Sequence, residues 1–403
     1  MKKKIAIFND FQLPVPAVRG GAVQQLTTAL LDCNEIDYRY DFEVYTPYDA
    51  RAVELSKKYK HSVFHFSKLA KYIRFYTNIC HKFKLPVNLS SLPLAPDIVW
   101  TFKHSRYDAI YVSGYVRGIL TIAKLNDGRC PVYYHHHVVT DILNEPSIQG
   151  EEIFRVCEKL GFVSQYACDK AHTGIEMYDE KIELFRNCID TKKFHVSNRE
   201  EVRNQMRKKY GIQSNDVVIV FVGRFVSNKG VLQLLKAFKE ACKEVSNIKL
   251  MLIGGETYSS NTKTEYVSAC MQIAETIKDK VIMTGYIPNN ELPNLLTVGD
   301  IGCVPSVYDE ACGLTALDLM ASGLPIITTD AGGLQEYVPD GCKCVSKWVM
   351  GMDIDDVVDG IKLSIIQYAH DEKLRNMHTE VAVNEVYKHD INFYLNMFRD
   401  FIN

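Results

Sequence analysis

An acidic loop between an apolar run and a helix is the first feature of this sequence that could do chemistry. Residues 301–304 read as a buried strand, and the loop that follows contains Glu310 and Gly313. Helical periodicity covers residues 314–322, and residues 324–328 form the next apolar run. A strand, a loop, a helix and a strand make a parallel α/β unit, and ligands of such units lie beyond the carboxyl ends of the strands.

The helix start after this loop could bind a phosphate group. We expect Cys312, Gly313, Leu314 and Thr315 to present backbone N–H groups at the start of the helix. These N–H groups have no partner inside the helix, and the helix dipole adds partial positive charge. This end of the helix is therefore a natural site for an anion such as a diphosphate.

Two acids flank the helix start. Glu310 precedes the helix, and Asp318 lies one turn into it. Because a carboxylate accepts hydrogen bonds from paired hydroxyls, the two acids could hold two sugars while the amides hold a diphosphate. In the alternative interpretation, Glu310 and Asp318 only favour the helix N-terminus and face water. The residues alone leave both interpretations open.

A second loop carries two cations. Residues 217–222 form a continuous run that is typical of a central parallel strand, and G-R-F-V-S-N-K-G follows at residues 223–230. Arg224 can grip two oxygens of a diphosphate, and Lys229 supplies a point charge. For any single pair of this kind, two solvated surface cations are the alternative. We favour a diphosphate site because the acidic loop lies downstream at the spacing of a second α/β domain.

The first half of the chain begins with a strand and a glycine pair. Residues 5–8 are an apolar run, and helical periodicity starts at Val23. Gly20 and Gly21 therefore stand at a strand-to-helix turn, where the backbone can approach a ligand closely. Most such pairs are only turns. The chain contains no G-x-G-x-x-G and no Walker-type loop, which counts against dinucleotide and P-loop enzymes.

Composition excludes several other classes of protein. The 403 residues are 47% hydrophobic and 24% charged, and they suffice for two globular domains. The net charge of −2 gives no indication of nucleic-acid binding. Twelve scattered cysteines without a C-x-x-C pair disfavour zinc and redox sites and suit a reducing cytoplasm. We find no apolar run long enough for a signal peptide or a membrane span.

A basic segment lies in the first half. Residues 51–107 contain eleven Lys and Arg against two acids. Within them, residues 68–84 have helical spacing, with apolar side chains on one face and cations around it. Such a helix could rest on an anionic membrane surface. In the alternative interpretation its apolar face is core and its charges are solvated, and the sequence leaves both open.

The two loops of the second half together resemble the donor-sugar motifs of retaining glycosyltransferase family 4, whose members have the two-domain GT-B fold. The family carries an acid, seven residues and a second acid. Glu310 and Asp318 match them, with Asp where the family has Glu. A G-x-P strand start follows at residues 323–325, and a T-x-x-G-G-x-x-E loop at residues 329–336. Upstream, residues 223–230 match the family's G-R-x-x-x-x-K-G motif.

This resemblance implies a role for each residue of the two loops. Arg224 and Lys229 would bind the diphosphate of a nucleotide-sugar donor, together with the amides around Gly313. Glu310 would hold hydroxyls of the donor sugar and fix its orientation. Asp318 would bind the nucleotide ribose. Arg224, Lys229 and Glu310 are accordingly the expected catalytic residues of this half.

The resemblance also implies contacts from two further loops. Tyr286 and Ile287 follow a strand-like run, at a position where the family places the nucleotide base. Gly20 and Gly21 stand where the family has a glycine pair against the donor phosphates and the acceptor.

Three consecutive histidines end a strand-like run that begins after Pro131. Histidines in a row alternate in direction along a strand, so residues 135–137 do not make a three-ligand metal site by themselves. The family has a strand that begins with Pro and ends in a His near the reacting sugar. Counting from Pro131, His137 matches that position best and His135 second. The implied catalytic role of His137 is a hydrogen bond to the donor sugar or support of charge in the transition state.

The resemblance implies an α/β fold of the GT-B type, with two Rossmann-like parallel-sheet domains facing a cleft. We expect an N-terminal acceptor domain over residues 1–190 and a C-terminal nucleotide-sugar domain over residues 191–383. Residues 384–403 would form a C-terminal helix that crosses back to the first domain.

The expected function is that of a retaining hexosyltransferase. It would move a sugar from a nucleotide-diphosphate donor, with a UDP-sugar expected, to a hydroxyl of a glycan or lipid-linked acceptor. The resemblance implies no metal ion and no cofactor. It suggests a role in cell-surface polysaccharide or lipopolysaccharide assembly, in the cytoplasm or at the inner face of the membrane. The alternatives are a nucleotide-sugar 2-epimerase of the GT-B fold and a non-catalytic glycan-binding relative.

Overall fold

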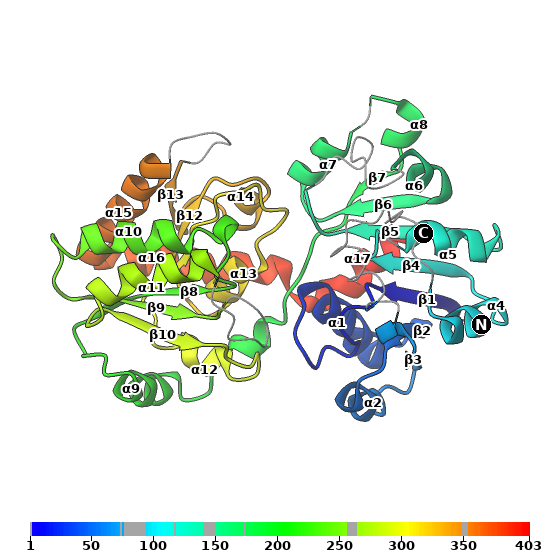
Figure 1. The fold of residues 1–403 in the computed structure, drawn as a ribbon, viewed down its shortest axis with the longest axis horizontal. Coiled ribbons are helices and arrows are strands. Elements are labelled where there is room, and N and C mark those ends of the chain that lie inside the picture. The colour runs from blue at the N-terminus through cyan, green and yellow to red at the C-terminus, as the bar shows by residue number, and fades with distance from the viewer. Residues whose placement is uncertain are drawn as a thin grey trace. The chain divides into compact units, whose positions relative to one another are not determined.

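The chain folds into two units. The structure is a computed structural model of the chain. It describes residues 2–72, 75, 94–116, 118–139, 150–172, 174–255, 264–347 and 354–403. The first unit consists of Met1–Cys188 together with Ile391–Asn403, and the second consists of Ile189–Asp390. Each unit is a parallel sheet with helices packed against it (Figure 1).

The first unit contains a seven-stranded sheet in the order β3-β2-β1-β4-β5-β6-β7, and all its pairings are parallel. Its strands are β1 (Lys3–Asn9), β2 (Tyr40–Pro47), β3 (Ser62–Ser67), β4 (Ala109–Ser113), β5 (Val132–His136), β6 (Lys159–Phe162) and β7 (Ile182–Leu184). Its longer described helices are α1 (Ala22–Ile36), α2 (Ala50–Ser56), α4 (Pro96–Lys103), α5 (Ile119–Asn126), α6 (Gly150–Val156) and α7 (Gln165–Ala171), and α8 (Glu176–Asp179) is a single turn.

The second unit contains a six-stranded parallel sheet in the order β10-β9-β8-β11-β12-β13. Its strands are β8 (Val217–Val222), β9 (Ile248–Ile253), β10 (Val281–Gly285), β11 (Ile301–Val304), β12 (Ile326–Thr329) and β13 (Lys343–Ser346). Its helices are α9 (Arg199–Lys209), α10 (Val231–Ala241), α11 (Glu265–Thr276), α12 (Leu292–Leu296), α13 (Leu314–Ala321), α14 (Leu334–Tyr337), α15 (Ile354–His370) and α16 (Glu372–Val386), with the short 3-10 turns η2 (Thr191–Phe194), η3 (Ser227–Lys229) and η4 (Tyr387–His389).

The β-branched run of the second unit forms a central strand, as its composition predicts. Val218, Ile219 and Val220 of β8 are fully buried. Because successive side chains of a strand point to opposite faces, both faces of this sheet are covered. The core that covers one face includes apolar side chains of α10, α11 and α15. The loops at the carboxyl ends of the strands are thus held by a rigid, two-sided core.

Both sheets reverse their strand order at one place, next to the first strand of each unit. In the first unit β1 lies between β2 and β4, and in the second unit β8 lies between β9 and β11. In open α/β sheets, ligands bind outside the carboxyl ends of the strands at this reversal point. The loops after β8 and β11 are those that carry the two candidate motifs.

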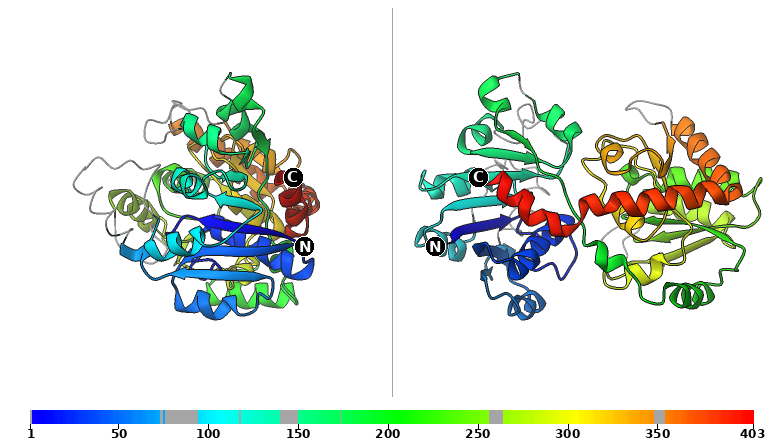
Figure 2. Two further views of the ribbon diagram at one scale, coloured as in Figure 1. Left: turned by 90° about the vertical axis from the view of Figure 1, so that its right-hand side faces the viewer. Right: turned by 180° about the vertical axis from the view of Figure 1, so that it is seen from behind.

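The end of the chain returns to the first unit through η5 (Ile391–Phe393) and α17 (Tyr394–Phe401) (Figure 2). The Phe398 ring packs edge-on against Tyr111, with the ring centroids 5.0 Å apart, and also contacts Tyr40. Tyr394 stacks on Phe185 at 5.4 Å. These apolar side chains are buried and hold α17 on the first sheet.

The returning segment begins later in the chain than the sequence suggests. Residues 384–390 belong to the second unit, where α16 continues to Val386. Ile189 pairs with Asp390, and the Asp390 carboxylate accepts a hydrogen bond from the backbone N–H of Thr191. The two chain crossings therefore lie side by side, at 188/189 and at 390/391. The boundary at residues 390/391 therefore coincides with the contacts of Asp390, which come after the end of α16, and not with an end of the helical pattern.

The predicted fold class is confirmed, since both units have parallel sheets with Rossmann-like strand order. Most of the basic segment at residues 68–84 lies outside the described residues. Among the described helices, none combines the length and the hydropathy that a bilayer-spanning helix needs.

The packing of α17 generates a first prediction. Replacing Phe398 by Ala should lower the free energy of unfolding by about 3–5 kcal/mol, because it removes a fully buried ring. Urea denaturation followed by circular dichroism measures the change. Phe393→Ala is the matched control, since that ring is 52% exposed and its loss should cost less than about 0.5 kcal/mol. Equal losses in the two variants would contradict the docking of α17.

Candidate active site

Two loops meet at the reversal point of the second sheet. The carbonyl oxygen of Asn228, after β8, accepts a hydrogen bond from the N–H of Val307, after β11, at 2.9 Å. Gly230 has a φ of +69°, and a Cβ atom there would come within 1.7 Å of the carbonyl oxygen of Pro305. Only glycine permits this approach of the two main chains. The last glycine of the G-R-x-x-x-x-K-G segment therefore brings the cationic loop to the acidic loop.

Lys229 and Glu310 form an ion pair where these loops meet. The Lys229 Nζ lies 2.6 Å from Glu310 Oε1, and the two side chains are 26% and 7% exposed. Ser306 donates its hydroxyl to the same carboxylate oxygen at 2.6 Å. Tyr308 donates to Oε2 at 2.5 Å and accepts a hydrogen bond from Lys229 Nζ at 3.1 Å. The predicted diphosphate ligand and the predicted sugar ligand are thus in direct contact.

The buried carboxylate of Glu310 fixes the position of the ammonium group. A carboxylate offers about four lone-pair positions, and the cluster occupies three of those on Glu310. Burial, together with the charge of Glu310, raises the pKa of Tyr308 above its ordinary value, so the phenol keeps its proton and remains a donor. Lys229 is therefore held by fixed partners before any ligand arrives.

Arg224 lies at the same end of the sheet, and its guanidinium forms no ion pair with a described residue. It follows β8 after one glycine and is exposed. Its charge opposes the rise of the Tyr308 pKa, which places the guanidinium in the electrostatic field of the cluster. Within the described ranges, Arg224 makes no ion pair. It is available to an anion that binds next to Lys229.

Backbone N–H groups lie at the start of α13. Gly313 precedes the helix with a φ of +79°, and a Cβ atom there would lie 2.5 Å from the Leu334 side chain. No side chain caps the helix. Cys312 is buried, whereas Leu314 and Thr315 are partly exposed. The Ala316 N–H donates to the carbonyl oxygen of Gly313 at 2.8 Å, so the N–H groups of Leu314 and Thr315 are those left for a ligand or solvent.

The T-x-x-G-G-x-x-E segment acts on the backbone of the acidic loop. The Gly333 N–H donates to the carbonyl oxygen of Glu310 at 2.7 Å, and Gly332 pairs with Glu310 as an isolated bridge. Thr329 donates its hydroxyl to the carbonyl oxygen of Ser306 at 2.6 Å. This segment holds the main chain on both sides of Tyr308, a role that its sequence did not reveal.

Asp318 lies in a different environment from Glu310. It is partly buried on α13, and its carboxylate makes no hydrogen bond to any described residue. Burial raises its pKa to about 7, and the charge of Lys193 only partly opposes this rise. Its ionisation therefore changes near neutral pH, unlike that of a solvated surface acid.

Tyr286 and Ile287 lie farther along the same sheet. They follow β10, which is the edge strand and is separated from β8 by β9. Tyr286 is exposed and Ile287 is partly buried. Their strand ends on the same edge as β8, but they belong to a separate part of it.

The three histidines of the first unit differ in their surroundings. Both ring nitrogens of His135 have partners, the Tyr111 hydroxyl at 2.8 Å and the Phe185 carbonyl at 2.9 Å. His136 is buried and contacts the Tyr134 hydroxyl. His137 is partly exposed, and its Nε2 lies 2.9 Å from Ser113 Oγ.

Burial keeps all three rings neutral at pH 7. It lowers the pKa of His136 to about 4 and that of His137 to about 3, and it lowers the pKa of His135 as well. Nδ1 of His137 is buried and has no hydrogen-bond partner in the described part of the chain. Asn187 lies close enough to the His137 ring to oppose part of the effect of burial on its pKa.

Gly20 and Gly21 form a turn that only glycine accommodates easily. Their φ values are +80° and +92°, and Gly21 is the residue before α1. A Cβ atom on Gly21 would lie 2.3 Å from the side-chain oxygen of Gln24. The neighbouring Arg19 is bound to Asp49 at 2.6 Å. The turn lies beyond the carboxyl end of β1, as expected.

The structure thus groups the predicted residues by unit. Arg224, Lys229, Glu310 and the start of α13 come together in the second unit, while Gly20, Gly21 and His137 lie in the first. Sequence reasoning missed Ser306 and Tyr308. Their position directly after a buried strand was the available signal.

The second unit matches a known family. Residues 202–382 fit the model of the glycosyl transferases group 1. These residues make up most of the second unit, which is therefore similar to the glycosyl transferases group 1. The predicted resemblance is therefore confirmed for this half of the chain.

Individual proteins are similar over different parts of the chain. Spore coat protein SA of Bacillus subtilis is 24% identical over 345 residues, which are 84% of this chain and 84% of that protein. The lipopolysaccharide 1,2-N-acetylglucosaminetransferase of Salmonella typhimurium is 33% identical over 141 residues, which are 34% of this chain and 37% of that enzyme.

Solved glycosyltransferase structures share the fold of the whole chain. Anabaena HepE in complex with UDP and glucose superposes with a TM-score of 0.71, at 18% identity and with 99% of each chain covered. This likeness supports the two-domain GT-B architecture. The second sheet of this architecture lies in the part of the chain that matches the family model.

The Tyr308 hydroxyl generates a prediction about the second unit. Tyr308→Phe should lower the free energy of unfolding by about 1.5–3 kcal/mol, the worth of a hydrogen bond to a charged group. Urea denaturation measures it. Tyr286→Phe removes the same atom from an exposed ring of the same unit and serves as the control. A Tyr308→Phe variant as stable as that control would show that the phenol does not support Glu310.

Asp318 generates a prediction about pH. Since its pKa is about 7 in the folded state and 3.8 in the unfolded state, its ionisation lowers the stability of the wild type as pH rises from about 4 to about 7. Asp318→Asn lacks this loss. The difference in unfolding free energy, variant minus wild type, should therefore increase between pH 5 and pH 8 in urea denaturation.

The test depends on how the difference in unfolding free energy between Asp318→Asn and the wild type changes with pH. Any loss of stability caused by the asparagine amide itself is the same at every pH and does not affect this slope. Asp279→Asn, at an exposed position of the same unit, should show a flat difference. A flat difference for Asp318→Asn as well would mean that the carboxylate is solvated.

Proposed function

We propose that this protein is a retaining hexosyltransferase that moves a sugar from a nucleoside diphosphate sugar to a hydroxyl of a glycan or lipid-linked acceptor. The observation that carries the proposal is the Lys229–Glu310 pair beside the unpaired Arg224 at the reversal point of the second sheet. The family of this domain and the names of its relatives agree with sugar transfer.

The chemistry requires positive charge at the leaving group. The bond between the sugar C1 and the diphosphate oxygen breaks, and a bond from C1 to the acceptor oxygen forms. The proton of the acceptor hydroxyl passes to the departing diphosphate. Arg224, Lys229 and the amides before Thr315 meet the negative charge that grows on that diphosphate. These groups supply the charge from the protein itself, so the proposal assigns no role to a metal ion or a cofactor.

Each remaining residue has a place in this proposal. Glu310 positions Lys229 and keeps about one lone-pair position for a hydroxyl of the donor sugar. Asp318, without a hydrogen-bond partner in the described ranges, accepts the ribose hydroxyls. His137 offers its neutral Nδ1 to the donor sugar. Gly20 and Gly21 border the donor phosphates and the acceptor, and Tyr286 and Ile287 contact the base.

The donor nucleotide and the cellular role belong to the same proposal. Since Anabaena HepE was solved with UDP, a UDP-sugar is the donor to test first. The Salmonella relative acts on lipopolysaccharide, which points to the assembly of a cell-surface glycan in the cytoplasm or at the inner face of the membrane. The family resemblance supports retention of the anomeric configuration as part of this proposal, with departure and attack on one face of the sugar.

The test measures nucleotide binding and turnover in matched variants. Isothermal titration with UDP, GDP, ADP and dTDP should show binding of UDP by the wild type. Lys229→Ala should lower the turnover of the UDP-sugar at least about a hundredfold, the effect of losing one preorganised charge contact. Lys236→Ala, on α10 and 43% exposed, should leave turnover unchanged.

A second variant separates catalysis from folding, because Lys229→Ala leaves Glu310 buried without its cation. Arg224→Ala removes an exposed side chain that makes no ion pair with the described residues, so it should lower turnover without lowering stability. Wild-type turnover in both variants would refute the diphosphate assignment. Epimerised nucleotide sugar without any acceptor would favour the 2-epimerase, and no binding of any nucleotide would favour a non-catalytic relative.

A further inference from the structure

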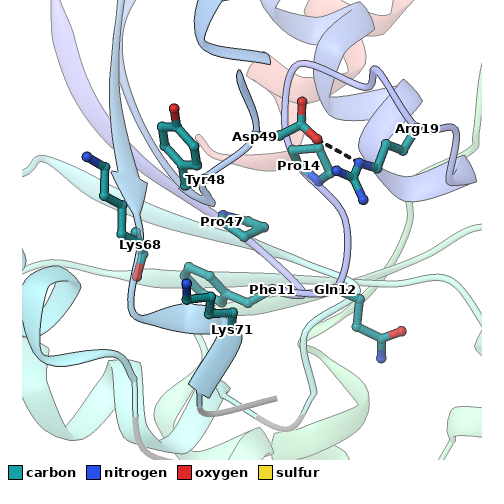
Figure 3. A pocket seen from close by; sticks show the side chains of 10 residues that line it. Phe11, Gln12, Pro14, Arg19, Pro47, Tyr48, Asp49, Lys68 and Lys71 are labelled. Atoms are coloured by element: carbon teal, nitrogen blue, oxygen red, sulfur yellow. Dashed lines mark hydrogen bonds and ion pairs between the residues drawn. The ribbon is translucent and has the colours of Figure 1, made fainter. Parts of the chain in front are cut away.

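A pocket lies at the carboxyl ends of three neighbouring strands of the first unit. It has a volume of about 340 Å³ and is lined from the segments that follow β1, β2 and β3 (Figure 3). This volume is at the small end of the range for small-molecule sites and suits one sugar unit rather than a long glycan. Such strand ends are where open α/β sheets bind ligands.

Cations dominate the lining of this pocket. Lys68 and Lys71 are exposed, and neither has an ion pair or a hydrogen bond to any residue that the structure describes. Figure 3 shows these two lysines on one side of the pocket and Arg19 on the other. The single acid of the lining, Asp49, is already bound to Arg19. The pocket therefore offers two positive charges that form no ion pair within the described part of the chain.

Arg19 is held in place by a buried partner. Asp49 caps α2 by accepting hydrogen bonds from the backbone N–H groups of Arg51 and Ala52, and its carboxylate is 5% exposed. The same carboxylate accepts a hydrogen bond from Arg19 Nε at 2.6 Å. The other side of the guanidinium remains free for a ligand, since the Arg19 side chain is 58% exposed. One wall of the pocket is thus rigid and cationic.

Aromatic side chains complete the lining. Phe11 and Tyr48 line the pocket, and the Lys68 ammonium lies 5.3 Å from the centre of the Tyr48 ring. Aromatic rings present apolar faces, which suit the C–H faces of a sugar, while the cations suit a charged substituent. The two kinds of side chain together fit a sugar that carries a negative charge.

The donor diphosphate already has its own cations in the proposed function. The cations assigned to that diphosphate, Arg224 and Lys229, belong to the second unit. We propose that the pocket of the first unit binds an anionic substituent, a phosphate or a carboxylate, on the acceptor sugar. This inference rests on the proposed transferase function and deepens it, because it makes the acceptor an acidic sugar. Lys68 and Lys71 would bind the anion, and Arg19 would orient the ring.

The test uses small sugars while UDP saturates the donor site. The probes are glucuronic acid, glucose 6-phosphate and glucose, titrated into the full-length protein by calorimetry. We expect the two anionic sugars to bind at least about tenfold more tightly than glucose, and this preference to weaken with added salt. The double variant Lys68→Ala/Lys71→Ala should lose the preference and keep the wild-type affinity for UDP.

Two controls locate the effect. Lys103→Ala/Lys124→Ala removes two exposed lysines from the same unit outside the pocket and should change nothing. Lys229→Ala should weaken UDP binding and leave the binding of glucuronic acid intact. Because Lys68 and Lys71 are exposed, their removal should not alter the thermal midpoint by more than the control pair does.

Several results would overturn the inference. Glucose binding as tightly as glucuronic acid would do so, as would an unchanged preference in the Lys68→Ala/Lys71→Ala variant. Loss of anionic-sugar binding in Lys229→Ala alone would assign the anion to the donor site. If phosphatidylglycerol vesicles bind through the two lysines and the sugars do not, the cations serve a membrane surface instead. If no nucleoside diphosphate binds the wild type, the transferase function fails and the acceptor assignment fails with it.

Discussion

The buried carboxylate of Glu310 is the constraint on which the second unit depends. An ionised group that loses water must be compensated by charge and hydrogen bonds, or folding suffers. Lys229, Ser306 and Tyr308 provide this compensation at the end of β11. To bring Lys229 there, the backbone after β8 must touch the backbone after β11, which Gly230 permits. The contacts that compensate the buried Glu310 carboxylate therefore also fix the Lys229 ammonium group. A fixed positive charge of this kind stabilises a departing anion.

The two sheets share a strand order but use their reversal regions in different ways. In the second unit the Glu310 carboxylate already accepts three hydrogen bonds and fixes Lys229, while Arg224 after the same strand makes no ion pair with a described residue. In the first unit the acid Asp49 fixes one cation, while Lys68 and Lys71 remain exposed in the segment after β3. A site that must match one defined diphosphate gains from rigidity. A site that admits a larger and more variable partner gains from exposed, adjustable lysines, whose long side chains can follow the position of an anion.

Local pattern predicted the strands and helices because these depend on short-range periodicity. The apolar run of β8 and the helical periodicity of α13 were both predicted from the sequence for this reason. Contacts between side chains of different loops could not be predicted from the sequence, because they depend on how the loops approach one another in the folded unit. The sequence placed Lys229 and Glu310 in one site but as ligands of separate groups, and it gave Tyr308 no role. The chain return at Asp390 was missed for the same reason, because a carboxylate contact after the end of α16 decides it.

The substitution of Asp for Glu at position 318 changes more than the reach of the side chain. A carboxylate on a shorter side chain stays closer to the helix, and the burial that raises its pKa to about 7 has no hydrogen bond from a described residue to offset it. Ribose hydroxyls that donate to Asp318 would stabilise its ionised form, so ligand binding and deprotonation are linked. Under the proposed function, the affinity for a nucleotide sugar therefore rises with pH through neutrality.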